Sequence, residues 1–151
     1  MKNVNNKVSV RVVRKTDNDL PVYETGLSAG MDVRAELEKP IVLNPGSSNL
    51  IPTGLYVEIP PGYEIQVRPR SGLAFKRGIT VLNAPGTIDA DYRGELGVIL
   101  INTSSESQTI EPGERIAQLV ISPVYQIEWV EVDELGDTER GSGGFGSTGV
   151  H

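Results

Sequence analysis

Residues 55–68 read LYVEIPPGYEIQVR and join two alternating segments through a turn signal. Residues 55–59 and residues 63–68 carry apolar side chains at every second position, which places those side chains on one face of a β-strand. Residues 60–62 (PPG) are of the types that tight turns favour. The stretch therefore predicts two half-buried β-strands joined by a turn.

Further apolar segments occur on both sides of this stretch. Residues 8–12 (VSVRV) and residues 129–132 (WVEV) also alternate, so we expect two more half-buried strands, with Trp129 in the core. Residues 97–101 (GVILI) and residues 116–121 (IAQLVI) are continuously apolar instead. Such runs are typical of strands covered on both faces, so these two strands are predicted to be central.

Turn signals separate these apolar runs, and little of the chain suggests a helix. The 17 glycines and 10 prolines fall between the runs, for example at residues 44–46 (NPG) and 111–113 (EPG). Only residues 72–76 indicate a helix, of one or two turns. The 151 residues suit one domain. The pattern predicts an all-β chain with the fold of a jelly-roll-like β-sandwich.

Composition and charge exclude several classes of function. The chain has no cysteine, which excludes thiol catalysis, thiolate zinc sites and disulfide bonds, and its one histidine is His151. The net charge of −6 disfavours nucleic acid and anionic membranes as partners. The chain has neither a signal-peptide pattern nor 18 consecutive apolar residues, so we expect a cytoplasmic protein without a membrane partner.

The C-terminal part of the sequence differs in composition from the rest. Residues 140–149 read RGSGGFGSTG and offer almost nothing to bury. We therefore expect a β domain over residues 1–136 and a flexible, glycine-rich arm over residues 137–151. Phe145 has no core to join there, so its ring either stays exposed or stacks on an arriving ligand.

Two segments carry side chains that suit phosphate oxygens. Residues 69–72 (PRSG) follow a predicted strand and combine a guanidinium group, a hydroxyl group and free backbone amides. An ordinary strand-end turn with a serine N-cap explains this segment equally well. Arg140, Ser147 and Thr148 repeat the same chemistry in the arm, where glycines allow backbone amides to curl around an anion.

Residues 83–95 (NAPGTIDADYRGE) form a polar stretch between two apolar strands. We expect a hairpin whose tip binds a ligand, and an acidic solvated loop is the alternative. Asp32 and Gln118 are isolated polar residues in strand-like surroundings. A structural hydrogen bond accounts for either of them, because buried polar groups need partners.

Five segments in this order resemble the motifs of the homotrimeric dUTP diphosphatase family, the dUTPases. They are AGMDVRA (29–35), PRSG (69–72), GTIDADYRG (86–94), GERIAQ (113–118) and RGSGGFGSTG (140–149). The resemblance runs over nearly the whole chain. It implies a jelly-roll subunit, a threefold trimer whose active sites are shared between chains, and dUTP as the small-molecule substrate.

The resemblance also implies a chemical reaction and the residues that perform it. Asp89 resembles the general base that activates the water attacking the α-phosphorus of dUTP, which releases diphosphate and leaves dUMP. The resemblance implies Mg²⁺ held mainly by substrate phosphates and waters, with Asp32 as outer-shell support rather than a direct ligand. This reaction would keep uracil out of DNA and supply dUMP for thymidylate synthesis.

Further residues are implied as substrate contacts by the same resemblance. Asn83 and the backbone of Gly86, Thr87 and Ile88 resemble the groups that read uracil. Tyr92 resembles the residue whose ring lies under the deoxyribose and excludes a 2′-hydroxyl. The phosphate contacts would be Arg70, Ser71, Gly72 and Gln118, and the arm that closes over the nucleotide would contribute Arg140, Phe145, Gly146, Ser147 and Thr148.

Two alternatives stay open at the level of sequence. The dCTP deaminase family is similar in fold, and its pattern has a glutamate general base where this chain has Arg93. Glu95 lies two positions further on, so deamination stays an alternative. A non-catalytic, nucleotide-binding β-sandwich is the second alternative.

Overall fold

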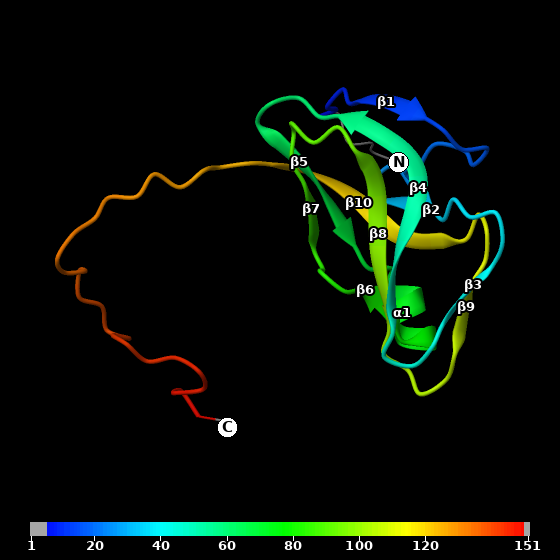
Figure 1. Ribbon diagram of the computed structural model, residues 1–151. Coiled ribbons are helices and arrows are strands. Elements are labelled where there is room, and N and C mark those ends of the chain that lie inside the picture. The colour runs from blue at the N-terminus through cyan, green and yellow to red at the C-terminus, as the bar shows by residue number, and fades with distance from the viewer. Residues whose placement is uncertain (1–5, 150–151) are drawn as a thin grey trace.

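The chain folds around two four-stranded antiparallel sheets, and the computed structural model describes residues 6–149. The first sheet has the strand order β1-β4-β8-β6. Its strands are β1 (Arg11–Arg14), β4 (Ser48–Glu58), β8 (Glu95–Asn102) and β6 (Ile79–Val81). Figure 1 shows β4 and β8 side by side through the middle of the body, as their pairing requires.

The second sheet has the strand order β2-β10-β5-β7. Its strands are β2 (Met31–Arg34), β10 (Arg115–Pro123), β5 (Tyr63–Arg68) and β7 (Gly86–Ile88). A small third sheet pairs β3 (Ile41–Leu43) with β9 (Gln108–Ile110). The helix α1 (Ser71–Arg77) links β5 to β6. No helix in the part of the chain that is described is long and apolar enough to cross a membrane.

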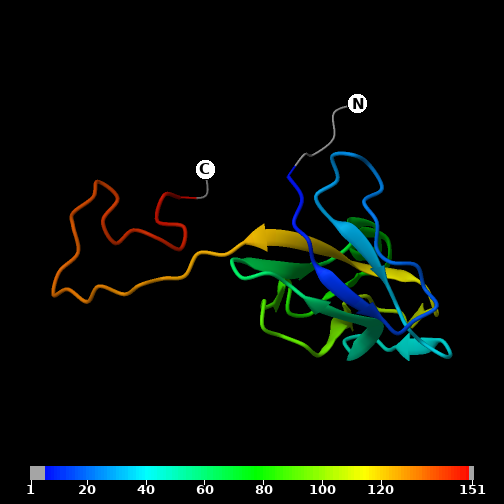
Figure 2. The same cartoon turned by 90° about the horizontal axis from the view of Figure 1, so that it is seen from above.

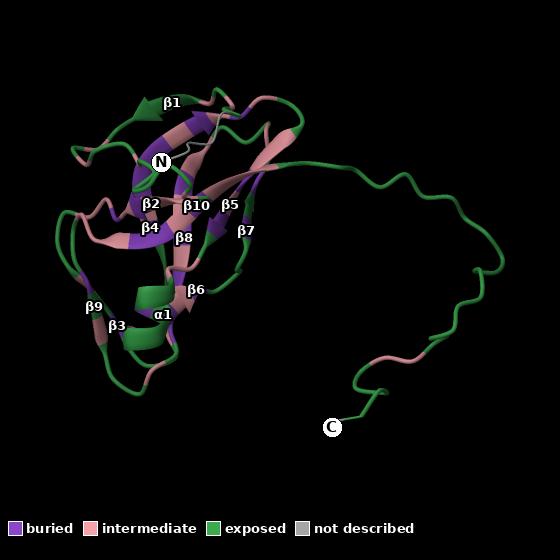
Figure 3. Ribbon diagram, turned by 180° about the vertical axis from the view of Figure 1, so that it is seen from behind, coloured by how far each residue is buried: buried purple, intermediate pink, exposed green. Residues whose placement is uncertain are grey.

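One apolar core joins the two large sheets. Ile51 of β4 and Leu100 of β8 are completely buried, and they belong to the same cluster as Ile65 of β5 and Leu119 of β10. The helix α1 adds Leu73 to this core. Figure 3 shows the buried residues along the facing strands, and the C-terminal segment is exposed over most of its length. The all-β sandwich predicted from the alternation is therefore confirmed.

The central strands lie where the apolar runs predicted them. Residues 63–68 coincide with β5, and residues 55–59 fall mostly within β4. Strand β8 lies between β4 and β6, and β10 lies between β2 and β5. In β8, however, burial alternates between buried and half-buried positions. Only its inner face is fully covered within one chain, so the prediction of two covered faces is wrong for β8.

The segment at residues 83–95 is more elaborate than the predicted hairpin. β6 and β8 do pair with each other in antiparallel register. The connection between them, however, crosses to the second sheet, where β7 pairs with β5. The hairpin was predicted from the two flanking strands alone. The polar connection between them contains the additional strand β7, in which Gly86 and Ile88 are buried.

Two predicted strands differ at the ends of the chain. β1 begins at Arg11 rather than at residue 8, and all four of its residues are exposed because it is an edge strand with an open outer side. Residues 129–132 form no strand, and Trp129 is 86% exposed. The prediction of Trp129 in the core is therefore wrong for the single chain. The last strand ends at Pro123, after which the chain leaves the body (Figure 1, Figure 2). The division at residues 136 and 137 stays a prediction.

Candidate active site

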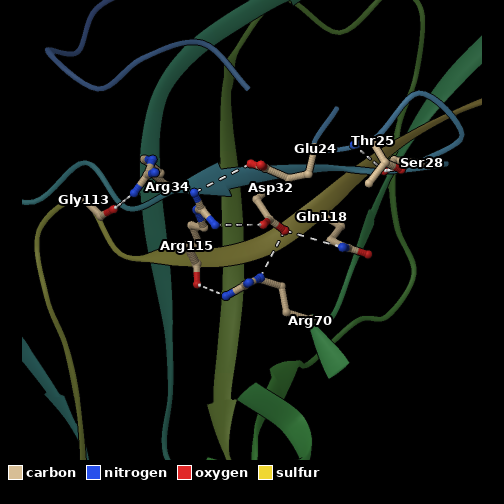
Figure 4. Close-up of polar contacts among 9 residues, drawn as sticks. All are labelled: Glu24, Thr25, Ser28, Asp32, Arg34, Arg70, Gly113, Arg115 and Gln118. Atoms are coloured by element: carbon tan, nitrogen blue, oxygen red, sulfur yellow. Dashed lines mark hydrogen bonds and ion pairs between the residues drawn. The ribbon is translucent and has the colours of Figure 1, made fainter. Parts of the chain in front are cut away.

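Strand register gathers three of the predicted site residues on the second sheet. Gln118 of β10 lies opposite Asp32 of β2 and, on its other side, opposite Arg68 of β5. Directly opposed residues project from the same face of a sheet. Arg70 follows β5 at the N-cap of α1, and its guanidinium group turns toward Asp32 (Figure 4). Three segments far apart in sequence therefore meet at one carboxylate.

Hydrogen bonds hold this cluster in place. Arg70 Nε donates to Asp32 Oδ1 at 3.0 Å, and Gln118 Nε2 is 3.5 Å from the same oxygen. Arg70 Nη1 also donates to the carbonyl oxygen of Arg115 at 3.3 Å. The side chains of Asp32 and Arg70 are 12% and 29% exposed. Partial burial and a second hydrogen bond fix the orientation of the Arg70 guanidinium group.

Arg115 is a member of this cluster that the sequence reasoning did not single out. Its Nη1 lies 3.9 Å from Asp32 Oδ2, and its Nη2 lies 3.7 Å from Glu24 Oε1. Asp32 therefore faces two guanidinium groups, and in the single chain their charge is offset by the carboxylates of Asp32 and Glu24. Arg115 belongs to the GERIAQ motif, so a signal for it existed. Glu24 lies in a loop and carries no sequence signal.

Ser71 and Gly72 begin α1 beside this cluster, and both are exposed. The N-cap of the helix is Arg70, which makes no side-chain capping bond. The alternative interpretation of residues 69–72 as a turn with a serine N-cap is therefore not what the structure shows. The hydroxyl of Ser71 and the guanidinium of Arg70 lie at neighbouring positions where β5 ends.

A separate pocket of about 240 Å³ contains the other predicted residues of the body. Six of its lining residues were predicted from the sequence: Asn83, Gly86, Thr87, Ile88, Asp89 and Tyr92. The remaining six were not: Leu50, Val67, Glu95, Leu96, Gly97 and Ile99. These last residues come from β4, β5 and β8, so the pocket joins the two large sheets where β7 crosses between them.

Close packing of β7 against β5 shapes this pocket. Gly86 lies opposite Val67. A Cβ atom at position 86 would lie 3.1 Å from Val67 Cβ and 3.4 Å from Asn83 Nδ2. Because that spacing is tighter than ordinary van der Waals contact, glycine lets β7 and the Asn83 side chain approach as they do. The backbone of residues 86–88 is thereby held in a rigid strand along the pocket wall.

Asp89 and Tyr92 lie on the turn that follows β7. Asp89 is exposed, and its carboxylate makes no hydrogen bond or ion pair with any residue in the range 6–149. The Tyr92 N–H donates to the carbonyl oxygen of Asp89 at 3.1 Å. The Tyr92 hydroxyl donates to the carbonyl oxygen of Glu95 at 2.9 Å. A free carboxylate and a tethered aromatic ring thus share one pocket.

The arm lies apart from both groups of residues. It runs away from the body after β10 (Figure 1, Figure 2), and its turns are local, as in the bond from Arg140 Nε to the Gly143 carbonyl at 2.7 Å. Phe145 has a positive φ of 51° and a fully exposed ring. Gly146, Ser147 and Thr148 are also exposed. The predicted arm residues contact neither the Asp32 cluster nor the pocket.

The chain therefore presents three groups of predicted residues that it does not unite by itself. No predicted residue of the Asp32 cluster lines the pocket. Within residues 6–149 there is also no group of three or more histidine, cysteine or acidic side chains placed to hold a metal ion. Asp32 supplies one carboxylate, and both of its oxygens face guanidinium groups.

The fold and these groups together define an all-β sandwich with a pocket and a separate cluster of guanidinium and carboxylate groups. The chain matches the family model described as dUTPase over residues 16–149. It belongs to the dUTPase family.

Named relatives cover nearly all of the chain. It is 62% identical over 143 residues to the deoxyuridine 5′-triphosphate nucleotidohydrolase of Fusobacterium nucleatum, spanning 95% of this chain and 98% of that protein. The protein of the same name from Cytophaga hutchinsonii is 57% identical over 145 residues, spanning 96% and 94%.

Solved structures show the same architecture. A mutant dUTPase of Staphylococcus bacteriophage 80alpha, solved with dUpNHpp, superposes with a TM-score of 0.83 at 30% identity, covering 94% of this chain and 99% of that one. A mutant dUTPase from phage phi11 of S. aureus, solved with a structural Mg(II) ion, superposes with a TM-score of 0.75 at 25% identity. It covers 85% of this chain and 99% of that one.

Proposed function

We propose that this chain hydrolyses dUTP to dUMP and diphosphate. Membership of the dUTPase family and the names of its relatives support the substrate. The observation that carries the proposal is the pocket in which Asn83, Asp89 and Tyr92 meet the rigid backbone of β7. That backbone offers fixed donors and acceptors for a base, and a mismatched base would leave them unpaired.

Asp89 is the general base of this mechanism. A water oxygen attacks the α-phosphorus, the bond from that phosphorus to the oxygen bridging to the β-phosphorus breaks, and the water proton passes to the Asp89 carboxylate. The Asp89 carboxylate is exposed and has no partner among residues 6–149, which supports this role because it is free to accept a hydrogen bond from water. Proton transfer to a positioned carboxylate typically contributes about 10²–10⁴-fold.

Phosphate oxygens bind at the Asp32 cluster in this proposal. Arg70 presents a guanidinium group that Asp32 orients, Gln118 lies 3.5 Å from the same Asp32 oxygen, and Ser71 follows Arg70 at the start of α1. Arg140 of the arm adds a further cation. Positive charge stabilises the transition state because the attacking water makes the phosphate group more negative.

The residues of the Asp32 cluster are compatible with a Mg²⁺ ion that substrate phosphates and waters hold. When bound, it neutralises phosphate charge and polarises the α-phosphoryl group. Asp32 suits outer-shell support rather than direct ligation, because its oxygens already accept from Arg70 and face Arg115. The Mg(II) ion of the phage phi11 dUTPase supports magnesium as the metal to test first.

We propose a homotrimer with shared active sites. One chain leaves the pocket, the Asp32 cluster and the arm apart, and assembly of several copies would bring groups from different chains together. The segment after β10 supports assembly as well, because Tyr125, Ile127 and Trp129 are 93%, 73% and 86% exposed. Apolar side chains at this density gain free energy when a second chain covers them.

A mixing experiment tests the shared site. One variant carries Asp89→Asn and the other lacks residues 140–151, and each alone is expected to be nearly inactive. Refolding the two together should restore a substantial part of the turnover, because some sites then combine an intact Asp89 with an intact arm. Light scattering should give about three times 16.3 kDa. A monomeric mass and no recovery would contradict the trimer.

Glu95 argues against the deaminase alternative. Its Oε1 accepts a hydrogen bond from the Gly54 N–H at 2.8 Å, so this carboxylate is engaged by the backbone. Arg93, at the position of the deaminase base, lies 3.7 Å from Glu58.

An assay with dUTP, dCTP, dTTP and UTP in the presence of Mg²⁺ separates the candidates. Diphosphate and dUMP released from dUTP alone support the proposal. Ammonia released from dCTP would indicate a deaminase, and binding without turnover would indicate a non-catalytic protein. We further propose that the activity is cytoplasmic, keeps uracil out of DNA and supplies dUMP for thymidylate synthesis. Cell fractionation and uracil content of DNA after depletion test these roles.

A further inference from the structure

The Tyr92 ring is folded back onto the chain that follows it. A Cβ atom at position 94 would lie 2.6 Å from Tyr92 Cζ, so the ring occupies space that only Gly94 leaves open. The Tyr92 hydroxyl donates to the backbone oxygen of Glu95 at 2.9 Å. The position of the ring in the pocket therefore depends on where the backbone of residues 94 and 95 is held.

The side chain of Glu95 bonds to the neighbouring strand. Glu95 begins β8 and lies opposite Tyr56 of β4. The β4–β8 register shifts between Pro52 and Tyr56, so β4 bulges there. Gly54 lies in the bulge with a φ of 71°, and its N–H donates to Glu95 Oε1 at 2.8 Å.

Other polar groups of the bulge also have hydrogen-bond partners. Thr53 Oγ1 donates to the Leu96 carbonyl at 2.6 Å and accepts from the Leu55 N–H at 3.2 Å. The Gly54 carbonyl accepts from the Lys15 N–H at 2.7 Å. Gly54 is buried, so loss of the Glu95 carboxylate would leave its N–H without a partner, which is a costly state for a buried amide.

We propose that Glu95 is a positioning residue that sets the Tyr92 ring against the sugar of the bound nucleotide. It ties the start of β8 to the β4 bulge, and the tethered ring follows the start of β8. The proposal rests on the function proposed above and on the resemblance of Tyr92 to the residue whose ring lies under the deoxyribose, and it extends that function to sugar specificity. Glu95 thereby controls how strictly the pocket rejects a 2′-hydroxyl, while the attack directed by Asp89 depends on it less.

The test compares Glu95→Ala with Glu95→Gln, using the ratio of kcat/KM for dUTP to that for UTP. Glu95→Ala should lower this ratio at least about tenfold, because a loose ring admits the 2′-hydroxyl. Glu95→Gln keeps an oxygen acceptor for the Gly54 N–H and should keep the ratio within about threefold of the unaltered chain. An unchanged ratio in Glu95→Ala would overturn the proposal, whether both substrates keep their activity or lose it equally.

Tyr92→Phe tests the same tie without disturbing the bulge. It removes the hydroxyl that donates to Glu95 and should lower the dUTP:UTP ratio in the same direction. In the double variant, Glu95→Ala should add little to Tyr92→Phe, because both changes release the same ring. Independent, additive effects would contradict the proposal, as would an unchanged ratio in Tyr92→Phe.

The same experiment distinguishes the failure of this proposal from the failure of the proposed function. If the unaltered chain does not turn over dUTP, the proposed function is wrong and this proposal falls with it. If it turns over dUTP and the variants keep its sugar preference, only the role of Glu95 is wrong. Thermal unfolding followed by circular dichroism shows whether each variant is folded.

Discussion

The pocket on the body and the C-terminal segment beyond β10 both carry predicted site residues, but those of the pocket lie on or beside a packed sheet, whereas those of the segment are exposed. Around the pocket, Gly86 and Ile88 are buried in a strand that pairs with β5. In the segment at residues 124–149 the structure shows no strand, and Trp129 and Phe145 are almost wholly exposed. Figure 3 shows this contrast: the purple, buried residues lie in the body, whereas the extension is mostly green.

The difference shows which parts of a site can be built in advance. The pocket wall is part of a hydrogen-bonded sheet over a packed core, so its geometry exists before a ligand arrives. The arm makes only local turns, so its position must be set by a ligand or by another chain. Under the function proposed above, a site divided in this way would combine rigid recognition with late closure, and water would be excluded only once the ligand is in place.

Asp89→Asn tests the proposed catalytic residue of the pocket and should have the largest effect on turnover. The amide keeps the size of the side chain but cannot take the proton, so kcat for dUTP should fall about 10²–10⁴-fold with binding nearly intact. Asp91→Asn is the matched control, because Asp91 is exposed on the same turn and does not line the pocket. Equal turnover in the two variants would remove Asp89 from the mechanism.

Leu100→Ala tests the packing that supports the prebuilt region. Leu100 is completely buried, and its truncation should lower the free energy of unfolding by about 2–5 kcal/mol. The same change at Leu135, which is 88% exposed, should cost less than about 0.5 kcal/mol. Denaturant unfolding measures both values. A comparable cost at Leu135 would show that the interface proposed for Tyr125, Ile127 and Trp129 extends to this residue.

The sequence predicted the body well because burial there follows from local patterns. The alternation in residues 63–68 and the apolar run in residues 116–121 place β5 and β10 without knowledge of their partners. The pocket residues Asn83, Gly86 and Tyr92 were also predicted, although on a hairpin. That β7 pairs with β5 is a long-range choice, which the flanking strands do not reveal.

The errors have the same physical origin. Residues 129–132 alternate like a half-buried strand. This pattern indicates that one face is buried, but it does not indicate whether the same chain or another copy buries it. The contacts of Arg115 with Asp32 and of Glu95 with Gly54 were not predicted, because each joins residues more than 40 positions apart in sequence. Periodicity reports the exposure of a side chain and not the identity of its neighbour.

Removing residues 140–151 tests the region that has no fixed place. The body should stay folded, since the described residues of the arm make no hydrogen bond to it. Turnover of dUTP should fall about 10²-fold, because the cation of Arg140 and the closure over the ligand are lost. Circular dichroism is the better measure of folding here, as Trp129 is exposed. Full activity of the shortened chain would contradict the role of the arm.

Phe145→Ala isolates the stacking contribution of the arm and should have the smallest effect of the four. The ring is fully exposed in the free chain, so its loss should leave thermal unfolding unchanged. Stacking on a base is worth about 1–3 kcal/mol, and the lower figure corresponds to a roughly fivefold rise in KM for dUTP. Phe145→Trp should retain most of the affinity, because any aromatic face stacks. Phe75→Ala removes a ring that is 91% exposed on α1 and should leave KM unchanged. If both alanine variants raise KM equally, the effect is one of general surface hydrophobicity, and the arm does not place Phe145 on the base.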